Sequence, residues 1–200
     1  TATSLTATSG YVSNGRQFST SGYVTVPHNS LLNPVTGVTI QAWIKPTGFT
    51  DNRVIAGKMP WTSNYSYQIS TTTSGTVRVD LSSNGTSYVY LASQTILNAA
   101  QWSNVAFTWD GSTVKIYING VQDANTLSFS GPIYGNSNNF EIGRPAGGST
   151  GVTQYFSGVI DEVMLYNRAL SLGELQQNYK AGDAITFRDG FQSHFKLDET

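Results

Sequence analysis

The fold of this chain is decided by one stretch, Phe156-Ser-Gly-Val-Ile-Asp-Glu-Val-Met-Leu-Tyr-Asn-Arg-Ala-Leu-Ser-Leu-Gly-Glu-Leu175. Its first half alternates as a β-strand does. One face would carry Val159, Asp161, Val163 and Leu165, and the other Ile160, Glu162, Met164 and Tyr166. Because both faces are mostly apolar, we expect this strand inside a layered all-β structure, although two adjacent carboxylates stand at its centre.

The second half of the same stretch predicts a short helix. Ser171 followed by Glu174 is a capping-box pattern. Leu172, Leu175 and Tyr179 then recur at helical spacing on one face. We therefore expect a buried strand, a bend, and a helical turn that packs back onto the sheet.

Short strand patterns separated by turn signals fill most of the remaining chain. The turn signals include Asn14-Gly15, Asn84-Gly85, Asp110-Gly111 and Asn119-Gly120, which are dipeptides that favour tight hairpins. Such signals recur at intervals of roughly eight to twelve residues. The pattern predicts an all-β fold, a two-sheet antiparallel β-sandwich of jelly-roll type, with one short C-terminal helical turn.

Composition excludes several classes of partner. The net charge is −1 and only 12% of residues are charged, so there is no electrostatic reason to bind nucleic acid or an anionic membrane. No apolar run approaches the ~20 residues of a membrane-spanning helix, and membrane insertion is not expected. The chain has no cysteine, which excludes disulfides and thiolate metal sites.

Six blocks, in order along the chain, carry a resemblance to a known family. They are Tyr23-Val-x-Val-Pro27, Val38-Thr-Ile-x-Ala-Trp-Ile-Lys-Pro46, Lys58, Gln101-Trp-x-x-Val-Ala-Phe-Thr-x-Asp-Gly111, Val114-Lys-x-Tyr-x-Asn-Gly-Val121 and Phe156-x-Gly-x-Ile-Asp-Glu-Val-x-x-Tyr-Asn-Arg-Ala-Leu-Ser-x-x-Glu-Leu175. Together they resemble the laminin-G-like, concanavalin A-like lectin-glucanase jelly-roll domains over about residues 16–180. The resemblance implies a single domain of this fold over residues 1–200, but it specifies no ligand.

The end of the chain departs from the family pattern. Such domains usually open with a strand that reads aromatic, x, Leu or Phe, Asp, Glu, whereas this chain carries His194-Phe-Lys-Leu-Asp-Glu199 at its end. We expect residues 191–199 to form a terminal strand that closes its own sheet, because an unfilled strand slot would expose unpaired N–H and C=O groups. The alternatives are a strand swapped into a neighbouring copy, or the start of a next repeat in a tandem array.

A terminal strand beside residues 160–165 would bring together Asp161, Glu162, Asp198 and Glu199. Like charges side by side on neighbouring strands are destabilising, and a Ca²⁺ ion would remove that cost. The resemblance implies the same, because these domains often hold a structural calcium near this strand. Asp161 and Asp198 are therefore the candidate ligands of a structural Ca²⁺. Alternatively, basic side chains pair with these acids, or the acids face water.

Catalysis is not expected. A glycosidase needs two carboxylates that flank the scissile bond. The glycanases that share this fold carry Glu-x-Asp-x-x-Glu on one concave strand, and this chain has no such run. The strands expected to line the concave face, at 65–69, 77–81 and 87–91, offer only one carboxylate, that of Asp80.

Aromatic residues provide the remaining hypothesis. Trp43, Trp102, Phe107 and Trp109 fit core positions of the family, whereas others are expected in or beside loops: Trp61, Tyr65, Tyr67, Tyr88, Tyr90, Tyr134 and Tyr155. Flat aromatic faces beside polar side chains suit a sugar, which needs both ring stacking and hydrogen bonds to its hydroxyls.

Four residues bracket two loops that we expect on one rim. Trp61 and Tyr65 bracket the loop after Lys58, while Arg144 and Tyr155 bracket a glycine-rich loop. The prediction is a non-catalytic carbohydrate-binding or adhesion module of an extracellular, cell-surface or virion-surface protein, with a glycan as partner. The alternative is a structural or protein-interaction domain (a capsid decoration, tail, stalk or adhesin repeat) in which these loops contact protein or a second copy of the chain.

Overall fold

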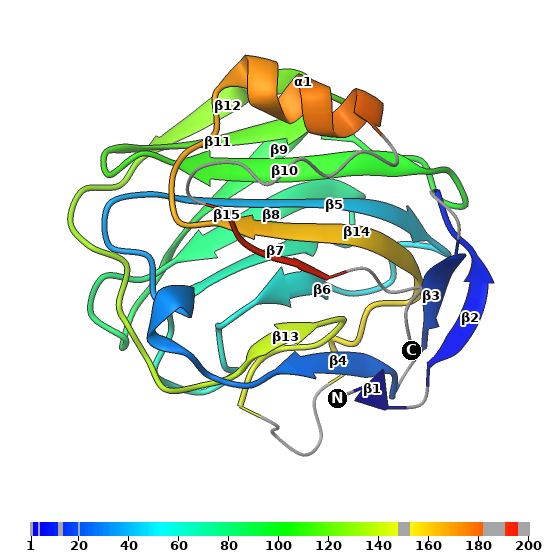
Figure 1. Ribbon diagram of the computed structural model, residues 1–200, viewed down its shortest axis with the longest axis horizontal. Helices are drawn as coiled ribbons and strands as arrows, with labels where there is room; N and C mark the ends of the chain where they lie inside the picture. Colours follow the sequence, from blue (N-terminus) through cyan, green and yellow to red (C-terminus); the bar gives the residue numbers. More distant parts are fainter. Residues whose placement is uncertain are drawn as a thin grey trace.

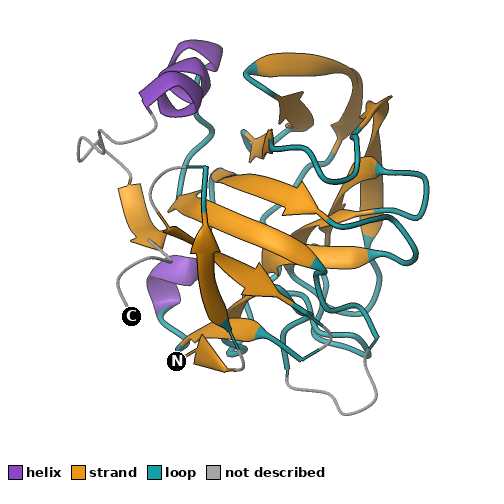
Figure 2. Ribbon diagram, turned by 90° about the vertical axis from the view of Figure 1, so that its right-hand side faces the viewer, coloured by secondary structure: helices purple, strands orange, loops and turns teal. Residues whose placement is uncertain are grey.

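Two antiparallel sheets packed face to face form the protein (Figures 1 and 2). The structure is a computed structural model that describes residues 2–3, 5–11, 14–19, 21–147, 153–181 and 191–195. The seven-stranded sheet has the order β1 (Ala2–Thr3), β4 (Tyr23–Val26), β13 (Phe140–Ile142), β6 (Arg53–Gly57), β7 (Tyr67–Thr71), β8 (Thr76–Leu81) and β9 (Val89–Ile96). In Figure 1 its central strands lie behind the other sheet.

The eight-stranded sheet has the order β12 (Val121–Ser128), β11 (Thr113–Ile118), β10 (Ser103–Trp109), β5 (Val38–Pro46), β14 (Gly158–Tyr166), β3 (Asn14–Phe18) and β2 (Thr6–Ser9). Its eighth strand, β15 (Phe191–Phe195), also pairs with β14. A short 3₁₀ turn, η1 (Ser30–Leu32), and one helix, α1 (Leu172–Ala181), complete the described elements. The predicted antiparallel β-sandwich with one short C-terminal helix is confirmed.

Inward-facing side chains of both sheets form one core. It includes Ile40 and Phe107 from the eight-stranded sheet and Ile69 and Val79 from the seven-stranded sheet, all essentially inaccessible to solvent. Tyr67 also lies in this core, so its assignment to the loop aromatics was wrong. It begins β7 on the inward side of the pleat, and its buried hydroxyl donates a hydrogen bond to the carbonyl oxygen of Leu32 at 2.7 Å.

A β-bulge changes the phase of β14. Pairing with β5 shifts between Asp161 and Met164, and Glu162 has a φ of 49°. The extra residue moves the inward face from Ile160 to Val163, because side chains alternate strictly only in an unbulged strand. The predicted division of β14 into two faces was therefore wrong beyond the bulge: Met164 packs on the outer side of the sheet.

The two ends of β14 have different neighbours on one edge. Gly158–Ile160 pairs with β3, and the residues after the bulge pair antiparallel with β15, Val163 opposite Phe195. The predicted terminal strand therefore docks beside β14 over its described part. Residues 196–199 lie outside the described residues, and the extent of the domain stays a prediction.

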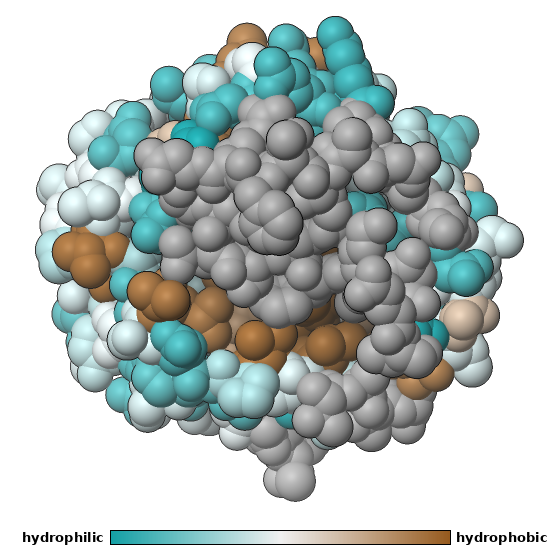
Figure 3. All heavy atoms as spheres, viewed as in Figure 1, coloured by the Kyte–Doolittle hydropathy of each residue, from teal (hydrophilic) through white to brown (hydrophobic). Residues whose placement is uncertain are grey.

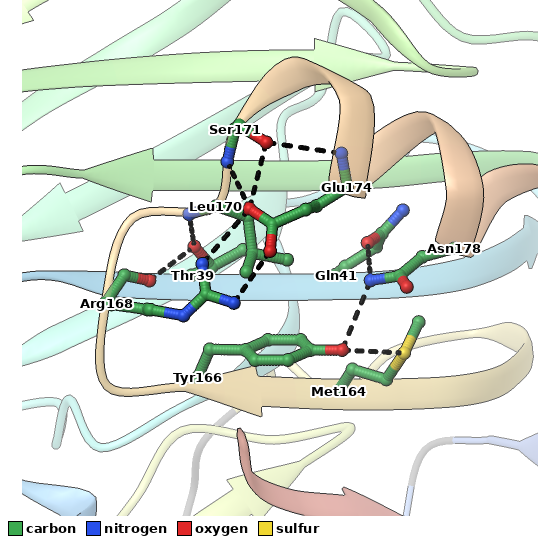
Figure 4. A network of polar contacts seen from close by, with 9 residues as sticks. All are labelled: Thr39, Gln41, Met164, Tyr166, Arg168, Leu170, Ser171, Glu174 and Asn178. Atoms are coloured by element: carbon green, nitrogen blue, oxygen red, sulfur yellow. Dashed lines mark hydrogen bonds and ion pairs between the residues drawn. The ribbon is translucent and has the colours of Figure 1, made fainter. Parts of the chain in front are cut away.

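The helix α1 begins with the predicted capping box (Figure 4). The Ser171 amide donates to Glu174 Oε2 at 2.9 Å, and the Glu174 amide donates to Ser171 Oγ at 3.4 Å. Arg168 donates two hydrogen bonds to the same carboxylate. These bonds, Arg168 first and Ser171 after it, outweigh partial burial and lower the pKa of Glu174 to about 2. Leu175 then packs on the outer face of the eight-stranded sheet.

Figure 3 shows the face of the molecule on the side of the eight-stranded sheet. Polar residues cover most of its described surface, and apolar residues gather in one band. Among the described helices, none has the length and apolar character needed to cross a membrane.

Candidate functional site

A row of mostly polar positions crosses the outer face of the seven-stranded sheet. Strand pairing aligns the following residues from β4 to β9: Thr25, Glu141, Gly57, Gln68, Asp80 and Tyr90. Residues directly opposite one another on paired strands share a face. The alternate positions, such as Ile69 and Val79, face the core.

Gly57 makes a low point in this row. A Cβ at this position would lie 2.5 Å from the carbonyl oxygen of Tyr67, so no side chain fits there. Gln68, which lies opposite Gly57, lines two adjoining hollows of about 100 and 160 Å³. They share four lining residues, Trp61, Gln68, Tyr88 and Gln154. We call the two hollows together the Trp61 groove.

Aromatic rings form the walls of the Trp61 groove. Trp61 is 54% exposed and Tyr88 45% exposed, so both rings present apolar faces to solvent. Tyr65 also lines the groove and meets Tyr88 edge-on, with 5.1 Å between ring centroids. Exposed rings of this kind can stack on a flat apolar partner.

The loop that carries Trp61 lies against the segment that follows β13. Pro60 forms a bridge with Ala146, and the Ala146 amide donates to the Met59 carbonyl at 3.1 Å. Pro145 thereby becomes part of the groove lining. The start of the glycine-rich loop thus shares a rim with the Trp61 loop; residues 148–152 lie outside the described residues.

An ion pair forms the floor of the groove. Arg78 donates through Nε to Asp80 Oδ1 at 2.8 Å, and Gln68 donates to Asp80 Oδ2 at 3.0 Å. The Arg78 guanidinium also lies 4.2 Å from the centroid of the Tyr90 ring. Burial alone would lower the pKa of Arg78, but the hydrogen bond and charge of Asp80 outweigh it and raise the pKa. Arg78 therefore stays charged and paired with Asp80.

Gln154 is the unusual residue of the groove. It is only 8% exposed and lines both hollows. Its backbone carbonyl accepts the Val54 amide at 3.1 Å, but its side-chain amide makes no hydrogen bond to any residue in the described part of the chain. Within the same described ranges, Gln68 Oε1 accepts no hydrogen bond. The groove therefore presents amide donors and acceptors that the protein itself leaves available.

Arg144 and Tyr155 lie in a second cluster rather than in the groove lining. Arg144 donates to both carboxylate oxygens of Glu141, at 3.2 and 3.1 Å, and its guanidinium covers the Tyr23 ring at 3.3 Å. The Tyr155 ring lies 6.5 Å from that of Tyr23. Burial would lower the pKa of Arg144, but Glu141 outweighs it and raises the pKa. Of the four predicted binding residues, the structure thus brings Trp61 and Tyr65 together and holds the other two in this neighbouring cluster.

Asp161 lies at the bulge of β14, in the eight-stranded sheet, whereas the groove lies on the seven-stranded sheet. Its Oδ2 accepts the Tyr11 amide at 3.0 Å, and its Oδ1 accepts the Glu162 amide at 2.9 Å. A carboxylate is a ligand type that Ca²⁺ accepts. The other candidate, Asp198, lies outside the described residues. Inside the described ranges, no three His, Asp or Glu side chains are grouped in a way that could hold a metal ion.

Sequence reasoning missed the polar half of the groove. Gln68 and Arg78 lie in predicted strands. Alternation along the strand puts Arg78 on the same face as Asp80, so the sequence could have indicated that these polar side chains share that face. Gln154 follows a loop and belongs to no periodic pattern. Its role becomes visible only when the chain folds it beside β6 and β7.

The fold and the site together define a class: a β-sandwich protein with a groove on one sheet that aromatic rings and side-chain amides line. The chain belongs to the concanavalin A-like lectin/glucanases superfamily, whose laminin G family model matches residues 18–176. No curated protein sequence matches the chain.

Solved structures with the same fold include proteins that are described as carbohydrate-binding or as complexes with a sugar. A proposed carbohydrate-binding protein from Bacteroides ovatus is 23% identical with a TM-score of 0.73; the match covers 93% of this chain and 51% of that protein. Domain 4 of AbnA, an extracellular arabinanase from Geobacillus stearothermophilus in complex with arabinotriose, is 20% identical (TM-score 0.66, 89% and 82% covered). The CBM40 of the Ruminococcus gnavus IT-sialidase, bound to α2,3-sialyllactose, is 22% identical (TM-score 0.60, 72% and 82% covered). The chain thus spans about half of the Bacteroides ovatus protein, and these likenesses show the fold.

Proposed function

We propose that this protein is a non-catalytic carbohydrate-binding module and that the Trp61 groove is its sugar site. One observation carries the proposal: the side-chain amide of Gln154 has no hydrogen-bond partner among the described residues, and it lines a hollow walled by exposed aromatic rings. The amide atoms of Gln154 are not among the fully buried side-chain atoms that lack a partner in the described part of the chain, so they remain accessible from the hollow. A sugar would bond to this amide through its hydroxyls while its C–H face covers Trp61.

The related structures support the same partner class. The arabinanase domain is described in complex with arabinotriose and the sialidase module with sialyllactose, so this fold carries sugar sites in other proteins. An extracellular location also fits, because the arabinanase is described as extracellular. A cell-surface or virion-surface setting, and an adhesion role, belong to this proposal as its narrower forms.

The carboxylates of this face favour binding over hydrolysis. A glycosidase needs one acid and one base or nucleophile that can reach the scissile bond. Asp80 is held by Arg78, and Glu141 by Arg144, so both acids on this row serve as ion-pair partners. We therefore propose a module that holds a glycan without converting it.

The proposed site is tested with a glycan array and titration calorimetry on four variants. Trp61→Ala and Gln154→Ala should each weaken binding of a captured glycan about tenfold or more, which corresponds to about 1.4 kcal/mol. Ile96→Ala and Gln122→Ala are matched controls, because they remove an exposed apolar side chain and an exposed glutamine outside the groove lining. Both controls should bind as the wild type does.

Two results would overturn the proposal. One is a bound glycan whose affinity is unchanged in both groove variants. The other is silence across neutral and acidic glycans, which would favour the structural or protein-interaction domain, particularly if ultracentrifugation shows self-association.

We also propose that Asp161 contributes to a structural Ca²⁺ site. Its carboxylate is already oriented by two backbone amides, which would leave it organised for a cation. The ion would screen the two adjacent acids of the bulge and stabilise the sheet. It has no role in the Trp61 groove.

A further inference from the structure

We infer that the Trp61 groove selects neutral glycans and rejects glycans that carry a carboxylate or sulfate. This inference rests on the proposed function and concerns the chemical class of its ligand. Among the described residues that line the groove, Arg78 and Asp80 are the only two with charged side chains. Their sum is zero, so the groove offers no net attraction to an anion.

Arg78, the cation among the described groove residues, is already paired within the protein. Arg78 reaches Asp80 Oδ1 through both Nε and a terminal nitrogen, at 2.8 and 2.6 Å, and its side chain is only 20% exposed. The ring of Tyr90 covers part of the guanidinium. An anionic sugar that took Arg78 for itself would leave the buried Asp80 carboxylate with a single donor from Gln68. Breaking a buried ion pair in this way is strongly unfavourable.

The uncommitted groups of the groove suit hydroxyls instead. The Gln154 amide offers two donors and an acceptor, and Gln68 Oε1 offers a further acceptor. Sugar hydroxyls both donate and accept, so they satisfy such a mixture without any charge. The Asp80 carboxylate on the floor can also accept a hydrogen bond from a sugar hydroxyl.

The second arginine of this face does not change the outcome. Arg144 is held by both oxygens of Glu141 and lies over Tyr23, with a side chain only 15% exposed. It therefore offers no more to an anionic group than Arg78 does. Its pairing also supplies a matched control, because Glu141 outside the groove repeats the chemistry of Asp80 inside it.

The test compares neutral glycans with their sialylated, uronic-acid and sulfated counterparts on an array, followed by calorimetry at about 0.05 and 0.5 M NaCl. The wild type should bind neutral members at least tenfold more tightly than their acidic counterparts, with little change between the two salt concentrations. Asp80→Asn keeps the shape of the floor but frees the charge of Arg78. It should gain tenfold or more in affinity for the acidic members, in a salt-dependent manner. Glu141→Gln should leave the specificity unchanged.

The outcomes distinguish the specificity for neutral glycans from the proposed sugar site itself. An acidic glycan bound as tightly as its neutral counterpart, and lost in Gln154→Ala, would overturn the specificity and leave the sugar site standing. A folded Asp80→Asn variant without any gain for acidic glycans would overturn the charge argument. If that variant does not fold, the wild-type comparison and its salt dependence decide alone. Silence towards all glycans would overturn the specificity together with the proposed function.

Discussion

Lys58 is a fully buried lysine next to the loop that carries Trp61, and we expect its titration to be visible in the stability of the protein. Its Nζ donates to Asn33 Oδ1 at 2.7 Å and to the Asn136 carbonyl at 3.1 Å, and it lies 3.1 Å from His28 Nδ1. Burial lowers the pKa of Lys58 from 10.5 to about 8. The lysine is therefore harder to keep charged in the folded protein than in the unfolded chain.

The sign of the effect follows from proton counting. Between pH 8 and 10.5 the unfolded chain keeps the Lys58 proton while the folded protein loses it. Stability rises with pH wherever the unfolded state binds more protons. The cost of the buried charge is therefore fully present below about pH 8 and disappears by about pH 10.5. Integrated from pH 7 to 9.5, the contribution of Lys58 to the free energy of unfolding should rise by about 2 kcal/mol.

Urea denaturation of the wild type and of Lys58→Met, at several pH values between about 7 and 9.5, isolates this contribution. Tyrosines and other lysines titrate in the same range, but they are common to both proteins and cancel in the difference. Lys180→Met, which removes an exposed lysine from α1, controls for the change in net charge. The stability of the wild type relative to Lys58→Met should increase with pH. A difference that stays flat or decreases would refute the reasoning.

Three further predictions concern the frame of the sandwich. Asp123 of β12 accepts two backbone amides of β9 at 2.9 and 3.0 Å, so Asp123→Ala should lower the free energy of unfolding by about 2–3 kcal/mol in urea titrations; a loss below about 0.5 kcal/mol would contradict this. If Asp161 holds a structural Ca²⁺, EDTA should lower the melting temperature and Asp161→Ala should remove the difference, whereas identical melts with and without chelator would end that proposal. Deleting residues 191–200 leaves one edge of β14 unpaired and should cause unfolding or aggregation in size-exclusion chromatography, and a soluble truncation of equal stability would show that the strand is dispensable.

The sheets were predictable because their signals are local. Dipeptides such as Asn84-Gly85 mark turns, and alternation marks the strands between them. The phase of β14 was not predictable, because one bulge residue, Glu162 at φ 49°, reverses the facing of every residue after it. Nothing in the alternation of apolar residues announces that insertion. The assignment of Tyr67 to the loop aromatics was wrong for a similar reason. Its burial depends on partners such as Leu32, which the fold brings from elsewhere in the chain.

The groove was predictable only in its aromatic half. Trp61 is a large apolar side chain in a loop between two strands, which is an unusual position that a sequence shows directly. Gln154 is one of many polar residues in loops, and its importance comes from burial and from the lack of a partner, which are properties of the folded chain. The pairing of Arg144 with Glu141, three residues before it, is likewise a property of the folded chain.

Asn136 connects the stability of the protein to its proposed site. Its side-chain amide donates to the Lys58 carbonyl at 2.9 Å and to the Asn64 carbonyl at 2.7 Å, and so it holds both ends of the loop that carries Trp61. Asn136→Ala should therefore lower the free energy of unfolding by about 2 kcal/mol and also weaken glycan binding severalfold, because the Trp61 ring loses its fixed position. Gln122→Ala again serves as the control. If Asn136→Ala loses stability but keeps full affinity, the contact of Pro60 with Ala146 holds the loop by itself, and the link between the buried amide and the groove is refuted.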